Sequence, residues 1–111
     1  GMGDNIRPAL YQSEYAVVPV ERPLEERSQK VTVAGKFCES GDVLARDVDL
    51  PEPETGELLA LPASGAYCLM MASNYNMQTR PAVVLVNQGT SRLIRRRETY
   101  QDLLASSIDF D

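Results

Sequence analysis

The sequence predicts one mainly β domain, a small Greek-key barrel or sandwich of about six strands with a short C-terminal helix. The apolar runs are short, and prolines and glycines, seven of each, interrupt the chain between them. Several of these runs are β-branched or alternate in polarity, whereas only one stretch carries helix-capping residues. A chain of 111 residues fits a single domain and is too short for a (β/α)₈ barrel, which needs roughly 200 residues or more.

The first half of the chain supplies three short strand candidates. Residues 15–20 are brief and β-branched, and residues 31–34 alternate in the period-2 pattern of a strand. An acidic loop with two prolines follows at 50–57, and prolines cannot sit in a central strand. Residues 58–61 form the next apolar run.

The second half supplies three more strands. Residues 66–72 are a continuous apolar run that suits a buried strand, although periodicity alone does not separate such a run from a buried helix. Residues 82–86 form the clearest strand. A glycine-containing turn at 87–90 joins them to residues 91–95, which predicts a β-hairpin.

One stretch, residues 99–106, has helical character. Thr99 can cap the helix, and Asp102 stands three residues further on. Leu103 and Leu104 supply an apolar face. This segment predicts the short C-terminal helix.

Composition excludes several function classes. The chain has no histidine, which removes Ser-His-Asp and Cys-His catalysis and histidine-based metal sites, and we expect no metal. The net charge of -5 opposes nucleic-acid binding, which depends on neutralising phosphates. No apolar run approaches the ~18 residues that span a bilayer, so we expect no membrane partner.

The cysteines and the start of the chain indicate a cytoplasmic protein. Cys38 and Cys68 are too far apart for a CxxC motif, and no basic or apolar leader precedes the domain. Reduced thiols are therefore expected. We interpret residues 1–2 as the remnant of an expression tag and residues 3–111 as the domain.

Three polar groups are candidates for chemistry. Residues 38–42, Cys-Glu-Ser-Gly-Asp, form the densest polar cluster, and a neutral thiol there can donate a proton. Arg7 with Tyr11 could recognise a carboxylate or phosphate, and Tyr67 could present its hydroxyl to a ligand. Judged from their neighbours in the chain alone, structural roles are favoured for all three groups. Residues 38–42 would form a turn whose cysteine packs inward, Arg7 would lie on the surface, and Tyr11 and Tyr67 would pack against other side chains.

The remaining basic residues give weaker signals. Lys30 and Lys36 could in principle form a Schiff base, but they flank a strand, as exposed edge charges usually do. Residues 95–97 are three arginines. The acidic balance favours a solvated or salt-bridged strand there over a nucleic-acid patch.

Five segments in order carry a resemblance to a known family. They are Arg-Pro-Ala-Leu-Tyr at 7–11, Cys-Glu-Ser-Gly-Asp at 38–42, Gly-Ala-Tyr at 65–67, Ser-Asn-Tyr-Asn at 73–76 and Arg-Arg-Arg-Glu-Thr-Tyr at 95–100. Over residues 6–104 the chain resembles the C-terminal portion of diaminopimelate decarboxylases. These are pyridoxal-phosphate enzymes of the alanine-racemase and ornithine-decarboxylase fold type.

The resemblance implies roles for five side chains. Arg7 and Tyr11 would help to bind the distal carboxylate of the substrate, and Glu39 would hold its distal amino group. Cys38 would donate a proton to the α-carbon after carbon dioxide leaves. Tyr67 would contact both cofactor and substrate. In the family, Cys38 and Glu39 act across a homodimer interface in the partner's site.

The resemblance covers only the β-domain of that family. The family's (β/α)₈ barrel carries the Schiff-base lysine, and neither Lys30 nor Lys36 matches it. We therefore expect the C-terminal domain of an enzyme that converts meso-2,6-diaminopimelate to L-lysine and carbon dioxide. Alone it would be inactive, because it lacks its partner, the N-terminal barrel domain, and the lysine that holds pyridoxal 5'-phosphate.

Two other readings remain open. The chain could be a free-standing β-barrel used for binding or assembly, or the same domain of a related amino-acid or polyamine-precursor decarboxylase. Glu39 and Ser40 after Cys38 favour diaminopimelate. Lys36-Phe37 replaces a proline common in the family, and residues 12–30 match loosely. Because the front of the family's chain adds a strand to this domain, we expect an unpaired sheet edge here, and with it dimerisation, strand swapping or aggregation.

Overall fold

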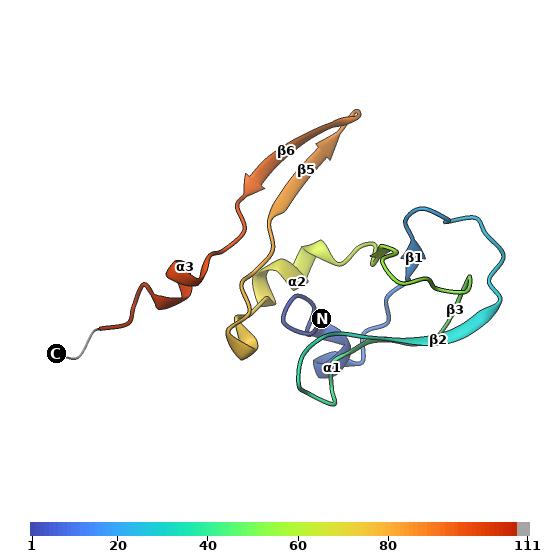
Figure 1. Ribbon diagram of the computed structural model, residues 1–111, viewed down its shortest axis with the longest axis horizontal. Helices are drawn as coiled ribbons and strands as arrows, with labels where there is room; N and C mark the ends of the chain where they lie inside the picture. Colours follow the sequence, from blue (N-terminus) through green and yellow to red (C-terminus); the bar gives the residue numbers. More distant parts are fainter. Residues whose placement is uncertain (109–111) are drawn as a thin grey trace. The chain divides into compact units, whose positions relative to one another are not determined.

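A computed structural model describes residues 1–108, and the chain divides into two compact units, Gly1–Ala72 and Ser73–Asp111 (Figure 1). The first unit contains α1 (Arg7–Tyr11), β1 (Val18–Pro19), β2 (Gln29–Ala34), β3 (Val43–Leu50), β4 (Leu59–Ala60) and α2 (Gly65–Met71). The described part of the second contains the 3₁₀ turn η1 (Tyr75–Met77), β5 (Val83–Asn87), β6 (Thr90–Arg95) and α3 (Tyr100–Leu104).

The six strands and the C-terminal helix confirm the predicted fold class. The strands form three antiparallel two-stranded sheets, β1 with β4, β2 with β3 and β5 with β6. Within residues 1–108 the sheets do not close into a barrel, because each strand pairs along only one of its edges. Every sheet of the described chain therefore has open edges.

Two helices depart from the prediction. Of residues 66–72, expected as a buried strand, residues 66–71 belong to α2, and Tyr67 therefore lies on a helix and not at a strand entrance. No β-branched residue occurs in this run, and alanine, leucine and methionine favour helix. The short helix α1 was also not expected. Pro8 fits its first turn, and Gln12 ends it in a left-handed conformation with φ of 54°.

The longest strand, β3, escaped the sequence pattern because it contains a bulge. Val31 pairs with Val48 and Val33 pairs with Ala45, so two residues of β3 face Thr32 alone. One of these two, Asp47, has φ of 53°, a left-handed conformation that aspartate tolerates. The bulge interrupts the alternation of polarity that would have marked the strand.

The first unit has a small core with two polar side chains in it. Its buried hydrophobic residues are Val17, Phe37, Leu50 and Cys68, and the buried polar residues are Asn5 and Asp42. Residues 1–2 make contacts in this unit: the carbonyl of Gly1 accepts from the amides of Asp4 and Asn5, and the Met2 amide donates to Asp42. Among residues 1–108, no helix has the length and apolar character required to cross a membrane.

The second unit ends in the predicted capped helix. The Thr99 hydroxyl accepts from the Asp102 amide, and the Asp102 carboxylate accepts from the Thr99 amide, which is a complete capping box at the start of α3. Arg96 donates to both carboxylate oxygens of Asp102, at 2.6 and 2.7 Å. Arg95 lies 3.7 Å from Glu98. The expectation of a salt-bridged arginine run is thus confirmed for Arg95 and Arg96.

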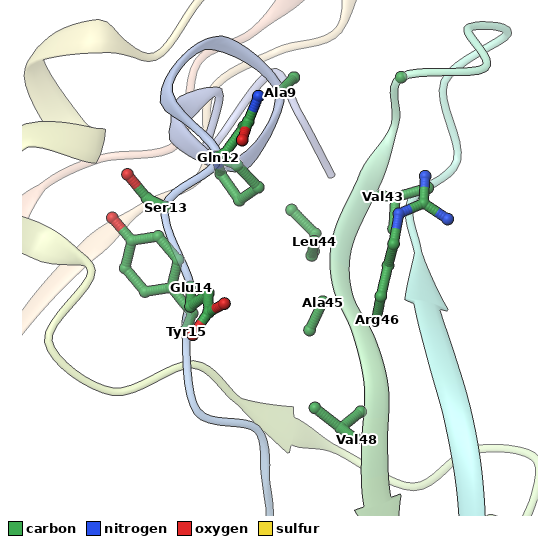
Figure 2. Close-up of a pocket in the computed structure, with 12 residues that line it drawn as sticks. Ala9, Gln12, Ser13, Glu14, Tyr15, Val43, Leu44, Ala45, Arg46 and Val48 are labelled. Carbon is green, nitrogen blue, oxygen red and sulfur yellow. The ribbon is translucent and has the colours of Figure 1, made fainter.

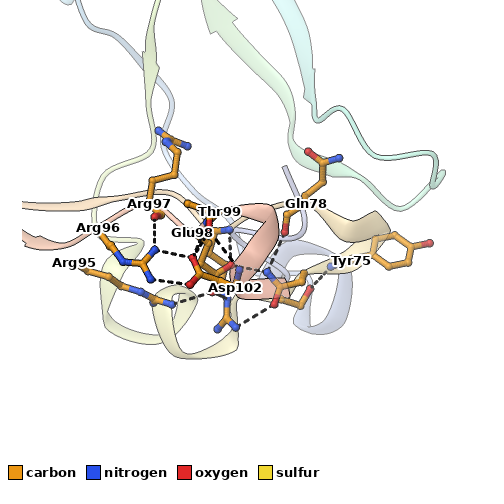
Figure 3. A network of polar contacts seen from close by, with 11 residues as sticks. Tyr75, Gln78, Arg95, Arg96, Arg97, Glu98, Thr99 and Asp102 are labelled. Atoms are coloured by element: carbon orange, nitrogen blue, oxygen red, sulfur yellow. Dashed lines mark hydrogen bonds and ion pairs between the residues drawn. The ribbon is translucent and has the colours of Figure 1, made fainter. Parts of the chain in front are cut away.

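A second polar group in this unit surrounds Glu98, as Figure 3 shows. Its carboxylate accepts from the Arg80 amide at 2.8 Å and from the Asn74 side chain at 2.6 Å, and the Arg80 guanidinium lies 2.9 Å away. Donation by the Arg80 backbone, with Asn74 and the two arginines, holds the pKa of Glu98 below its usual value. The network ties the turn that begins at Asn74 to the segment after β6.

Acid is expected to undo the cap of α3. Hydrogen bonds from Arg96 and Thr99 hold the pKa of Asp102 well below its usual range. A carboxyl whose pKa is lowered by folding stabilises the fold above its unfolded pKa of about 3.9 and loses that contribution as the pH falls further. The Thr99 amide resonance, followed by NMR from pH 6 to about pH 1, should therefore keep its hydrogen-bonded shift below about pH 4 and lose it only near the acid end of this range, where the lowered pKa of Asp102 is reached.

Asp102→Asn should make that resonance insensitive to pH across the same range, whereas Gln101→Ala, which changes an exposed neighbour, should keep the wild-type titration. An unchanged titration in Asp102→Asn would contradict the assignment to this carboxyl.

Candidate functional site

Three of the five predicted site residues come together in the first unit. The Arg7 guanidinium lies over the Tyr67 ring, 4.7 Å from its centroid, and over the Tyr11 ring at 5.3 Å. Arg7 and Tyr11 stand four residues apart on α1, which places them on one face of the helix. Tyr67 comes from α2, and both tyrosine rings are largely exposed.

This arrangement prepares the guanidinium to bind an anion. A cation–π contact uses the charge of the guanidinium and does not consume its N–H donors. Arginine presents these donors as a rigid planar fork that matches a carboxylate. Two rings that hold one guanidinium also limit its rotamers, so less entropy is lost on binding. The exposed phenols of Tyr11 and Tyr67 add hydroxyl groups next to the charge.

A buried cluster lies behind this cation. The Cys68 thiol donates to the Asn5 side-chain oxygen at 3.1 Å, and the same oxygen accepts from the Arg7 backbone amide at 3.2 Å. The Tyr15 hydroxyl lies 3.5 Å from the Cys68 sulfur. The hydrogen bond with Cys68 and partial burial raise the pKa of Tyr15, against a smaller lowering by Arg7. The sequence predicts no role for Asn5 or Tyr15. Their only signal is closeness to Arg7 and Tyr11 in the chain.

Cys38 and Glu39 lie in the tight turn between β2 and β3. Both side chains are exposed, and Cys38 is a free thiol, so the expectation that it packs inward is wrong for this chain. The Glu39 carboxylate accepts from the Gly41 amide at 3.1 Å and from the Ser40 hydroxyl at 3.4 Å. The turn therefore presents a thiol and a carboxylate side by side to solvent.

Asp42 fixes the shape of this turn from inside. Its side chain is buried, and its two oxygens accept from the Met2 amide at 2.6 Å and from the Phe37 amide at 2.8 Å. Its backbone accepts from the Gly35 amide and donates to Glu39. A Cβ at Gly35 would collide with the Asp42 carboxylate, so only glycine fits there. The sequence places Asp42 in the polar cluster but does not predict this internal role.

The two groups of predicted residues are separate in this chain. Within residues 1–108, no hydrogen bond, ion pair or ring contact joins the Cys38 turn to Arg7, Tyr11 or Tyr67. A groove of about 630 Å³ is lined by Pro8 and Ala9 of α1, residues 12–15, Gly41 of the turn and residues of β3 (Figure 2). None of the five predicted site residues lines this groove.

The lysines of this chain do not provide a place for pyridoxal phosphate. A Schiff base requires a neutral amine. The exposed Lys30 ammonium pairs with Asp49 at 3.0 Å and donates to the Asp47 carbonyl, and Lys36 is exposed on the turn. Tyr67 has an exposed ring that a cofactor could contact. In the described part of the chain, no group of three acidic or cysteine side chains gathers as a metal site.

Comparisons with known proteins find that the relatives of this chain are of one kind. The family model for the pyridoxal-dependent decarboxylase C-terminal sheet domain matches residues 1–65. The diaminopimelate decarboxylase from Synechocystis is 57% identical to this chain over 104 residues, and the one from Bacillus subtilis is 50% identical over 110 residues. These matches cover 94% and 99% of this chain, but only 22% and 25% of the relatives.

Solved structures give the same result. A diaminopimelate decarboxylase from M. jannaschii, determined with L-lysine, is similar with a TM-score of 0.89 and 41% identity over 98% of this chain and 25% of that one. The diaminopimelate decarboxylase from Helicobacter pylori, also determined with L-lysine, is similar with a TM-score of 0.85 and 34% identity. This match covers 95% of this chain and 26% of that one. The chain thus spans about a quarter of the length of the proteins that it matches.

Proposed function

Because the chain belongs to the family of C-terminal sheet domains of pyridoxal-dependent decarboxylases, we propose that it is the C-terminal part of a diaminopimelate decarboxylase. The whole enzyme would convert meso-2,6-diaminopimelate to L-lysine and carbon dioxide. The observation that carries this proposal is the Arg7–Tyr11–Tyr67 cluster, a half-buried arginine in contact with two exposed rings, because a guanidinium held in this way suits a carboxylate.

Each predicted side chain has a role in this proposal. Arg7 and Tyr11 bind the carboxylate that is not lost, and Glu39 binds the amino group beside it. Cys38 delivers a proton from its sulfur to the α-carbon, in place of the departing carbon dioxide. The cofactor, when bound, supplies an electron sink, so the protein contributes position and a proton and no strong nucleophile.

The rest of the enzyme is the partner in this proposal. A barrel domain supplies the lysine, which neither Lys30 nor Lys36 provides. The separation of the Cys38 turn from the Arg7 cluster supports a composite site, in which Cys38 and Glu39 serve the second subunit of a homodimer. The isolated chain is then inactive. A place in the cytoplasm agrees with two free thiols.

A chimera tests the proposal. This chain replaces the matching C-terminal segment of the Bacillus subtilis relative, and release of carbon dioxide from meso-diaminopimelate is measured. We expect turnover with the chimera and none with either part alone. A folded chimera that binds pyridoxal phosphate but leaves diaminopimelate intact would overturn the proposal. Turnover of ornithine, arginine or lysine instead would favour a related decarboxylase.

Arg7→Lys in the chimera is expected to raise KM for diaminopimelate by about 10- to 100-fold with a smaller change in kcat. Lysine keeps the charge but loses the planar fork and its contact with both rings. Arg46→Lys, an exposed arginine on β3, is the matched control and should leave both constants unchanged. An equal effect of the two substitutions would contradict a specific role for Arg7.

A further inference from the structure

We infer that Asn5, Cys68 and Tyr15 form a positioning cluster that aligns Arg7 with Tyr67 and thereby sets the affinity for the carboxylate. This inference rests on the proposed function and extends it to three residues for which the sequence predicts no role at the site. The cluster lies in the first unit and joins the beginning of α1 to α2.

One oxygen atom connects the two sides of the cation site. The Asn5 side-chain oxygen accepts from the Arg7 amide at 3.2 Å and from the Cys68 thiol at 3.1 Å, across 63 residues of sequence. Arg7 and Tyr67 are therefore fixed to the same atom, one through its own amide and the other through its neighbour Cys68. Their side chains meet in the 4.7 Å cation–π contact.

The protonation of the cluster follows from its geometry. A thiol has a single proton, and that of Cys68 is directed to Asn5. The Tyr15 hydroxyl must then donate to the sulfur, 3.5 Å away. The raised pKa of Tyr15 agrees with a phenol that stays protonated in this contact. The chain of donors runs from Tyr15 through Cys68 to Asn5.

Stability alone does not explain Asn5. The residue is 7% exposed, and its amide nitrogen is buried with no hydrogen-bond partner within residues 1–108. A buried donor without a partner costs free energy that an apolar side chain of similar size would avoid. What asparagine provides at this position is an acceptor oxygen between two donors. Its contribution is therefore the orientation of Arg7 and Tyr67.

The effect of the cluster should be restricted to ligands that carry the carboxylate. L-lysine, the proposed product, keeps the carboxylate that Arg7 binds, whereas cadaverine has the same carbon chain and amino groups without it. Loss of the cluster loosens Arg7 and Tyr67 but leaves Cys38 and Glu39 in their own turn. A general loss of folding would weaken both ligands alike.

The test uses two variants of the chimera, one with Cys68→Ala and one with Tyr15→Phe. The tyrosine substitution removes only the hydroxyl and preserves the ring. We expect the Kd for L-lysine, measured by calorimetry, and the KM for diaminopimelate to rise about tenfold, with kcat within twofold and cadaverine binding unchanged. Cys68→Ser, which keeps a donor, should restore most of the affinity. Met70→Ala, an exposed neighbour on α2, is the control and should change nothing.

The outcomes separate this inference from the function on which it rests. An unchanged Kd for L-lysine in both Cys68→Ala and Tyr15→Phe, or equal weakening of L-lysine and cadaverine, would overturn the positioning role while the chimera remains an active decarboxylase. A wild-type chimera without turnover would overturn the proposed function, and the positioning inference with it.

Discussion

Cys38→Ala is expected to lower kcat of the chimera by about 10²- to 10⁴-fold, the usual contribution of a positioned proton donor. KM for diaminopimelate should change little, because Arg7, Tyr11 and Glu39 are untouched. The exposed thiol at the tip of the turn between β2 and β3 has the access that such a role requires. Carbon dioxide release and lysine formation, measured in single-turnover and steady-state experiments, check this result.

Two further variants sharpen the test of Cys38. Cys38→Ser replaces the thiol with a hydroxyl, which can still donate a proton but is much less acidic, so we expect an intermediate rate. Lys36→Ala changes an exposed residue on the same turn and should leave kcat within twofold of the wild type. Full activity in Cys38→Ala would assign the proton to another donor.

Asp42→Ala is expected to lower the free energy of unfolding by about 2–4 kcal/mol, because two amide donors then lose a charged acceptor in a buried place. These donors are the amides of Met2 and Phe37. In the chimera, kcat should fall as well, since Phe37 leads directly into Cys38. Urea unfolding followed by circular dichroism measures the free energy of unfolding, and release of carbon dioxide by the chimera measures kcat.

The matched control for Asp42 is Asp49→Ala. Asp49 is an exposed aspartate whose ion pair with Lys30 lies on the surface of the β2–β3 hairpin, where such pairs contribute about 0–1 kcal/mol. Asp42→Asn keeps one acceptor oxygen, so its loss in free energy of unfolding should lie between those of Asp42→Ala and Asp49→Ala. If Asp42→Ala and Asp49→Ala were equally stable, the carboxylate would not be what fixes the turn.

The sequence predicted those elements whose signals are local. The β5–β6 hairpin and the capping box of α3 follow from residues adjacent in the chain, and both are confirmed. The helix α2 was missed because a seven-residue apolar run fits either period. The strand β3 was missed because the bulge at Asp47 breaks its alternation.

The candidate site shows the same limit. The turn with Cys38 and Glu39 could be located as a polar cluster, but its internal acceptor, Asp42, binds Met2 from 40 residues away. The meeting of Arg7 with Tyr67 also depends on contacts across the whole first unit. Roles for these side chains came from the resemblance, since no spacing rule connects residues on separate helices. The roles themselves stay predictions.

The register of the β5–β6 hairpin places two arginines opposite the segment with the highest expected tendency to form amyloid. Residues 83–86, Val-Val-Leu-Val, have high β propensity and no charge, and Val84, Leu85 and Val86 are exposed on a strand with an open edge. Opposite them, Arg95 faces Val83 and Arg92 faces Leu85. Arg95 lies 3.7 Å from Glu98, which offsets part of its charge, so we expect Arg92 to be the main gatekeeper, whose charge repels a stacked copy. Neutralising Arg92, or screening it with salt, is expected to favour fibril growth from this segment.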